Sequence, residues 1–101
     1  MTETRQRIDK WLWFARMVKT RTLAQDIVSR GQVRVNRTRI AKASHEIGPG
    51  DVITLAIHGR VRVVRVAGVG ARRGPASEAQ TLFEDIAETI STASENLLHK
   101  P

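Results

Sequence analysis

The chain has 101 residues, no cysteine, and 17 Lys and Arg against 10 Asp and Glu, a formal net charge of +7. Its length suits one small domain, and the lack of cysteine excludes disulfides, iron–sulfur clusters and cysteine-ligated zinc. The apolar runs are too short to span a bilayer, and the polar first residues have no signal-peptide pattern, so we expect a cytoplasmic protein without membrane contact.

Two short helices are predicted at the start of the chain. A first helix over residues 7–18 has one apolar stripe, formed by Ile8, Trp11, Leu12, Ala15 and Val18. We expect Trp11 and Phe14 in the core, whereas Trp13 packs on the C-terminal helix or offers a stacking face. Thr20 or Thr22, the latter with Gln25 at capping-box spacing, is suited to begin a second helix, and Gly31 to end it.

Strands are predicted next. Val33 and Val35 alternate with polar residues, and residues 36–39 form a hairpin turn before Ile40. Residues 48–51, Gly-Pro-Gly-Asp, predict a turn into a buried strand over 52–57. His58 and Gly59 then turn the chain into a return strand over 60–66. Its apolar alternation slips between Val63 and Val64, which indicates a bulge or twist.

The C-terminal part is predicted as a Gly- and Arg-rich loop and a third helix. Ser77 and Gln80 have capping-box spacing, and one apolar face holds Ala79, Leu82, Phe83, Ile86 and Ile90. From Ser91 onward we expect fraying. The fold class is therefore α+β: two N-terminal helices on a small twisted, mainly antiparallel sheet, with a C-terminal helix packed back on it. We expect a domain over 7–67, with the loop and last helix in 68–101.

Catalytic and metal chemistry find little support. The histidines, His45, His58 and His99, lack the spacing of a metal site, and no phosphate-loop Lys-Ser/Thr follows the glycines of the 68–74 loop. That loop remains a weaker candidate for anion binding at the start of the third helix. Asp9 lies beside Arg7 and Lys10 and is expected to order these cations rather than act as an acid or base. We therefore expect no enzyme, no cofactor and no metal.

The charge is concentrated near the start of the chain. Residues 1–75 hold 16 Lys and Arg and 5 acids, whereas residues 76–101 hold 1 and 5; the first 42 residues alone hold 11 and 3. A basic body suggests a polyanion partner, with nucleic acid favoured over an acidic membrane surface or a merely solvated basic face. Helix N-termini, arginines and a hairpin suit the recognition of backbone and shape in structured RNA.

Several motifs in order resemble a known RNA-binding module. Residues 7–12 (Arg-Ile-Asp-Lys-Trp-Leu), 19–21 (Lys-Thr-Arg), 31–36 (Gly-Gln-Val-Arg-Val-Asn) and 50–53 (Gly-Asp-Val-Ile) resemble the domain named after ribosomal small-subunit protein four. Together with residues 72–79, Arg-Arg-Gly-Pro-Ala-Ser-Glu-Ala, they resemble the bacterial heat-shock protein 15 family over residues 7 to about 88. The resemblance implies a helix pair and hairpin, called the αL motif, that binds RNA.

The family resemblance also implies a function and a site. It implies binding of ribosomal RNA or tRNA on the large ribosomal subunit, where the protein would help to recycle stalled or blocked subunits in the stress response. It also implies binding of DNA. The RNA-binding residues would be Arg7, Lys10, Arg16, Lys19, Thr20, Arg21, Gln32, Arg34, Asn36, Arg37 and Arg39, with Arg72 and Arg73 as secondary candidates. Thr20 and Arg21 match the family's Ser/Thr-Arg step, which would hold a phosphate.

The sequence departs from the family's pattern at one residue and in its C-terminal segment. Other functions therefore stay open. Arg37 stands where the family usually has Gly after Asn36, and residues 76–101 are acidic where family members often carry a basic extension. We expect a monomer. The first alternative is a DNA-binding or regulatory protein of the same fold. The second is the targeting domain of an RNA-modifying enzyme, for which 101 residues leave no catalytic domain. The third is a protein-interaction module that docks through Trp13 and the acidic C-terminal helix.

Overall fold

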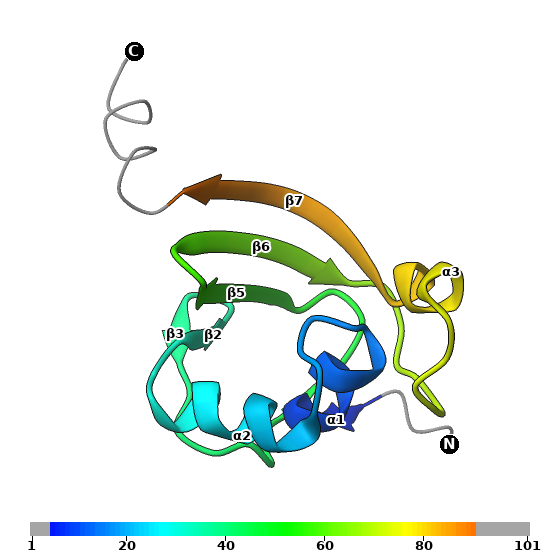
Figure 1. Ribbon diagram of the computed structural model, residues 1–101, viewed down its shortest axis with the longest axis horizontal. Coiled ribbons are helices and arrows are strands. Elements are labelled where there is room, and N and C mark those ends of the chain that lie inside the picture. Colours follow the sequence, from blue (N-terminus) through cyan, green and yellow to red (C-terminus); the bar gives the residue numbers. More distant parts are fainter. Residues whose placement is uncertain (1–4, 91–101) are drawn as a thin grey trace.

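A computed structural model describes residues 5–90, so the predicted fraying after Ser91 lies outside the described residues (Figure 1). The elements in chain order are β1 (Gln6–Arg7), α1 (Ile8–Phe14), α2 (Arg21–Ser29), β2 (Val33–Val35), β3 (Thr38–Arg39), β4 (Glu46–Ile47), β5 (Val52–Ile57), β6 (Arg60–Val66), α3 (Ala76–Ala79), the 3₁₀ turn η1 (Gln80–Leu82) and β7 (Phe83–Ile90).

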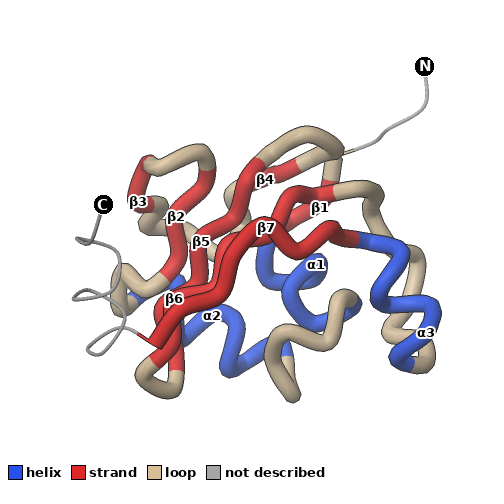
Figure 2. The backbone as a smooth tube through the Cα atoms, turned by 90° about the horizontal axis from the view of Figure 1, so that it is seen from above, coloured by secondary structure: helices blue, strands red, loops and turns tan. Residues whose placement is uncertain are grey.

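Two antiparallel sheets organise these elements. The main sheet has five strands in the order β3-β2-β5-β6-β7, and β1 pairs separately with β4. In Figure 1, α1 and α2 lie along one side of the main sheet, and Figure 2 shows the strands side by side with α1, α2 and α3 around them. The predicted α+β class is confirmed. None of the helices in the described part of the chain could span a lipid bilayer.

Helix α1 ends earlier than its apolar stripe predicts. Arg16 has φ 61°, its N–H donates to the Trp13 carbonyl at 3.1 Å, and the Met17 N–H donates to the Leu12 carbonyl at 2.9 Å. These two bonds form a Schellman motif, which stops the helix after Phe14 although no glycine is present. The prediction of a helix through Val18 was therefore wrong by one turn, because Ala15, Met17 and Val18 are buried from the turn that follows.

Helix α2 has the predicted limits. The Thr20 hydroxyl oxygen accepts the Leu23 N–H at 3.0 Å, so Thr20 is the N-cap and Thr22 is not. At the other end Gly31 has φ 77° and donates to the Val28 carbonyl, while Gln32 donates to the Ile27 carbonyl. This second Schellman motif turns the chain into β2.

The predicted turns between strands are confirmed. Asn36 and Arg37 have φ 52° and 73°, and His58 and Gly59 have φ 55° and 74°. Positive φ at both central residues marks type I′ turns, whose twist matches that of the flanking strands. Gly50, at φ 97°, supplies the left-handed residue of the turn that leads into β5.

The third helix is much shorter than predicted. Helix α3 is one turn, with Pro75 rather than a serine at its N-cap, so the predicted Ser77 capping box was wrong. Residues Phe83–Ile90 form strand β7, not a helix, and β7 pairs with β6 from Val66↔Phe83 to Arg60↔Ile90. The edge of β6 pairs with β7 through main-chain hydrogen bonds on both sides of a bulge, and such long-range pairing overrides a local apolar period.

A bulge interrupts this pairing, as predicted from the valine alternation. Val63 lies opposite Ala87 and Val64 opposite Asp85, so Ile86 is the additional residue. Ile86 is 45% exposed. The Arg65–Glu84 ion pair (2.8 Å) joins the strands on one side of the bulge, and the Arg62–Asp85 ion pair (3.0 Å) crosses it.

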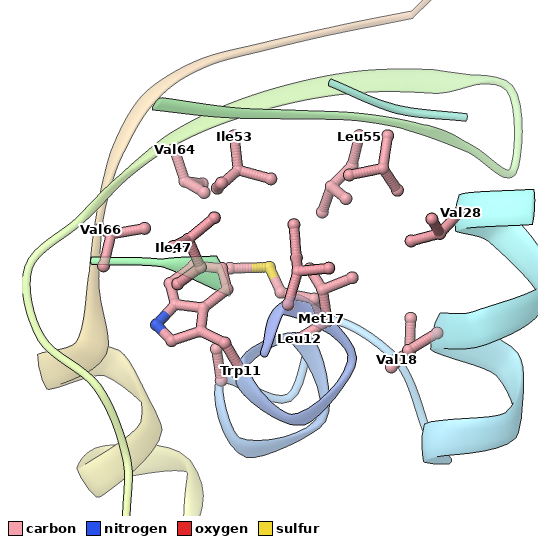
Figure 3. Packing of buried hydrophobic residues seen from close by; sticks show 14 of the residues in the cluster. Trp11, Leu12, Met17, Val18, Val28, Ile47, Ile53, Leu55, Val64 and Val66 are labelled. Atoms are coloured by element: carbon pink, nitrogen blue, oxygen red, sulfur yellow. The ribbon is translucent and has the colours of Figure 1, made fainter. Parts of the chain in front are cut away.

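The core lies between the helices and the main sheet. Figure 3 shows Trp11 and Leu12 of α1 directed toward Ile53, Leu55, Val64 and Val66 of the sheet, with Ile47 between them. Trp11 is fully buried, and its indole N–H donates to the Gly68 carbonyl at 2.9 Å. Phe14 is buried as predicted. Trp13 is only partly buried, with the Arg73 guanidinium carbon 5.9 Å from its ring centroid.

Candidate nucleic-acid interface

One buried carboxylate joins the two N-terminal helices. Asp9 has no exposed surface and accepts a bidentate pair of hydrogen bonds from Arg7, at 3.1 and 2.9 Å. From α2, Arg21 Nη2 donates to it at 3.3 Å and Gln25 Nε2 at 3.1 Å. The Lys10 N–H completes the set at 2.7 Å. A buried carboxylate with this many donors holds both arginines at fixed positions beside the helix pair.

These contacts determine the ionisation of Asp9. Burial raises the pKa of the Asp9 carboxyl, but the hydrogen bonds from Arg7, Gln25, Arg21 and the Lys10 N–H together outweigh it, so the pKa lies below its usual value. Asp9 is therefore charged near neutral pH. The prediction that it orders cations is confirmed for Arg7, but its second cation is Arg21, because Lys10 contributes its backbone N–H and not its ammonium.

The two arginines that bind Asp9 are still partly exposed to solvent. The side chains of Arg7 and Arg21 keep 44% and 35% of their surface exposed. Arg21 Nε is buried without a hydrogen-bond partner. Both side chains thus contact Asp9 and keep part of their surface accessible from outside.

The β2–β3 hairpin gathers a second group of cations. Arg34 and Arg39 lie directly opposite each other in the antiparallel pair, and Arg37 stands in the turn between their strands. All three are exposed, and none of them forms an ion pair with a side chain that the structure describes, in residues 5–86. Directly opposed like charges destabilise a strand pair, so this arrangement has an electrostatic cost in the free protein.

A third group surrounds the connection between α1 and α2. Arg16 Nε donates to the Gly74 carbonyl at 2.8 Å, and Lys19 is exposed nearby in the chain. Arg73 donates to the Trp13 and Val18 carbonyls at 3.2 and 3.3 Å. Arg16, Lys19 and Arg73 line the same hollow. Arg72, by contrast, is paired with Glu78 at 2.8 Å.

Three polar residues expected in the site also have structural contacts within the protein. The Thr20 hydroxyl caps α2, and Gln32 Nε2 donates to the Ala56 carbonyl at 2.8 Å. The Asn36 amide donates to Asp51 at 3.0 Å and accepts the Val52 N–H at 2.9 Å, which fixes the hairpin turn to the start of β5. Lys10 is exposed beside the Asp9 cluster.

Sequence reasoning missed one residue of the Asp9 cluster. Gln25 was interpreted as a capping-box partner of Thr22, yet its amide binds Asp9. The spacing of Gln25 and Arg21, four residues apart, places both on one side of α2, and this spacing was the available indication.

Comparison with known proteins agrees with this geometry. The S4 domain family matches residues 6–53, which contain both N-terminal helices and the hairpin. Heat shock protein 15 of Escherichia coli (strain K12) is 40% identical over 84 residues, which are 83% of this chain; the chain spans 62% of the length of that relative. The RQC P-site tRNA stabilizing factor of Bacillus subtilis (strain 168) is 37% identical over 60 residues, 59% of this chain and 69% of the relative.

A solved structure extends the similarity to nearly the whole chain. The trimeric structure of Vibrio cholerae heat shock protein 15 superposes with a TM-score of 0.78 and 35% sequence identity. The match covers 95% of this chain and 96% of that chain. The family suggested by the sequence motifs is thereby confirmed: the chain belongs to the heat shock protein 15 family.

Proposed function

We propose that this protein binds structured RNA and catalyses no reaction. Its RNA would be ribosomal RNA or tRNA on the large ribosomal subunit, bound during the recycling of stalled or blocked subunits under stress. Membership of the heat shock protein 15 family supports this role, as does the S4 domain match over residues 6–53. A Bacillus subtilis relative is named for stabilising P-site tRNA.

The observation that carries the proposal is the group of exposed arginines on the β2–β3 hairpin, which have no acidic partner among the described side chains. Arg34 and Arg39 face each other across two strands without a carboxylate, and Arg37 holds a φ of 73°, where glycine is the usual residue. An arginine at each of these positions lowers the stability of the free hairpin. An RNA phosphate between the guanidinium groups would offset the repulsion and would use their planar geometry.

The Asp9 cluster supplies a second contact surface for RNA. Because Asp9 holds one edge of Arg7 and of Arg21, these arginines lose little conformational freedom when a phosphate binds. We propose as RNA-binding residues Arg7, Lys10, Arg16, Lys19, Thr20, Arg21, Gln32, Arg34, Asn36, Arg37 and Arg39, with Arg73 ahead of the Glu78-paired Arg72 as secondary candidates.

Salt dependence tests the electrostatic part of this proposal. With about five phosphate contacts, a plot of log affinity for unfractionated tRNA against log salt should have a slope of roughly −3 to −5. Changing Arg34→Gln and Arg39→Gln together should make the slope shallower by about 2, since two counterion-releasing contacts are lost. Fluorescence anisotropy at several salt concentrations measures both slopes.

The matched control is Arg65→Gln. Arg65 is also an exposed strand arginine, but its charge is neutralised by Glu84 at 2.8 Å, so its loss should leave the slope unchanged. A salt-independent affinity, or an unchanged slope in the double variant, would remove the hairpin from the site. Duplex DNA that competes as strongly as tRNA would indicate a DNA-binding protein instead.

A further inference from the structure

A groove lies between α2, the connection that precedes it, and the β5–β6 turn. Three adjoining hollows form it, and His58 lines all three. Met17, Leu23 and Ile57 are each shared by two of the hollows, so they make a continuous apolar floor. The groove is therefore one extended surface with an aromatic ring at its centre.

The rim of the groove is positively charged. At one end stand Arg16, Lys19 and Arg73, the first and last of which donate to main-chain carbonyls rather than to carboxylates. Asp26 is the one acidic residue among the described lining residues, and Arg30 already pairs with it at 3.2 Å. The groove thus combines an apolar floor with three cations at one end, Arg16, Lys19 and Arg73, that form no ion pair with a described side chain, whereas Arg62 at the other end is paired with Asp85.

The groove is separate from the Asp9 cluster. Successive residues of a helix are about 100° apart, so Leu23 points roughly 200° away from Arg21 and from Gln25. Arg21 and Gln25 contact Asp9, whereas Leu23 lines the groove. A ligand in the groove would therefore lie along the other flank of α2 from a phosphate held beside Asp9.

We infer that this groove holds an unpaired nucleotide of the bound RNA. The base would stack on the His58 ring and cover Leu23 and Ile57, while its phosphates would contact Arg16, Lys19 and Arg73. A nucleotide presents a flat, largely apolar base next to an anion, which is the combination that this floor and rim provide. An acidic aliphatic peptide would suit the charge equally, but it has no flat ring to stack on the His58 ring.

The geometry of the His58 turn supports a clean test of this inference. His58 has φ 55° at the first central position of a type I′ turn, followed by Gly59 at φ 74°. Asparagine is favoured at that position, so His58→Asn removes the ring and keeps the turn. His45 is an exposed histidine that does not line the groove, and His45→Asn is the matched control.

The inference rests on the proposed function. Two RNA probes distinguish the contribution of the bases to binding from that of the sugar-phosphate backbone. Fluorescence anisotropy would compare hexaadenylate RNA with the same sugar-phosphate chain lacking its bases. The unchanged protein and His45→Asn should bind the base-bearing probe about tenfold more tightly than the abasic one. In His58→Asn the ratio should fall to about twofold or less, with abasic binding unaffected.

Each other outcome overturns the inference. Equal affinity for the two probes would show that no base is bound, and an undiminished ratio in His58→Asn would place the base elsewhere. Displacement of RNA by a hexapeptide of alternating Glu and Leu, dependent on His58 and with no preference between the probes, would assign the groove to a peptide. The proposed function is tested separately, with tRNA and the Arg34 and Arg39 variants. Failure of that test can therefore be distinguished from failure of the nucleotide-groove inference.

Discussion

Replacing Asp9 with alanine should lower the free energy of unfolding by about 3 kcal/mol. The carboxylate is fully buried and is the common acceptor for Arg7, Arg21, Gln25 and the Lys10 N–H. Its loss leaves these donors without their partner at the contact between α1 and α2. The arginine side chains are partly exposed and can turn toward water after the change. The expected loss of stability therefore lies at the lower end of the range for breaking a buried ion pair. Urea unfolding followed by tryptophan fluorescence measures it.

Asp26→Ala is the matched control for this change. Asp26 pairs with Arg30 on the surface of α2, where the two side chains are 44% and 69% exposed. Such a pair contributes between about 0 and 1 kcal/mol. If both alanine variants lost the same small amount of stability, Asp9 would not join the helices in the way that its contacts indicate.

The effect of Asp9 should also depend on pH in a defined direction. Its hydrogen bonds lower the pKa of the folded carboxyl from the ordinary value of 3.8. The charged form is thus favoured by folding, so its contribution is complete above pH 3.8 and is lost as the pH falls through the folded pKa. The difference in unfolding free energy between the unchanged protein and Asp9→Asn should therefore shrink below that pH. A constant difference would contradict a charged Asp9.

Trp11→Ala should destabilise the protein by about 3–5 kcal/mol. Trp11 is the largest fully buried side chain, it lies beneath the main sheet, and its indole N–H binds the Gly68 carbonyl. Truncation leaves a cavity and also an unpaired carbonyl in the loop after β6. Urea unfolding followed by far-ultraviolet circular dichroism measures this loss without depending on the tryptophan signal.

Trp13→Ala provides the comparison two residues along the same helix. Trp13 is only partly buried and contacts Phe14 and Arg73 near the surface, so its truncation should cost clearly less than that of Trp11. Equal costs would mean that the indole of Trp11 does not fill the centre of the core.

Features decided by local chemistry could be predicted from the sequence. Thr20, Gly31 and the turns at Asn36 and His58 have the predicted roles, because capping and positive φ depend on a few neighbouring residues. Strand β7 could not be predicted in this way. Its apolar residues match a helical period, and only the free edge of β6, distant in sequence, makes the extended form more favourable.

The same distinction applies to the candidate site. The cations could be identified from composition and motif order, but their pairing could not. Arg72 is neutralised by Glu78, whereas Arg34 and Arg39 are left opposite each other by the register of β2 and β3. Asp9 could be recognised as an organiser of cations, yet the identity of its second arginine depends on how α1 packs on α2.

In-cell ultraviolet crosslinking of the full chain, followed by sequencing of the attached RNA, tests the proposed function most directly. We expect large-subunit ribosomal RNA or tRNA to be enriched, and the enrichment to fall sharply in the variant with both Arg34→Gln and Arg39→Gln. The Arg65→Gln variant should retain the enrichment, because Glu84 already neutralises that side chain. Crosslinks spread over messenger RNA, or an enrichment unchanged by loss of the hairpin arginines, would contradict the proposed function.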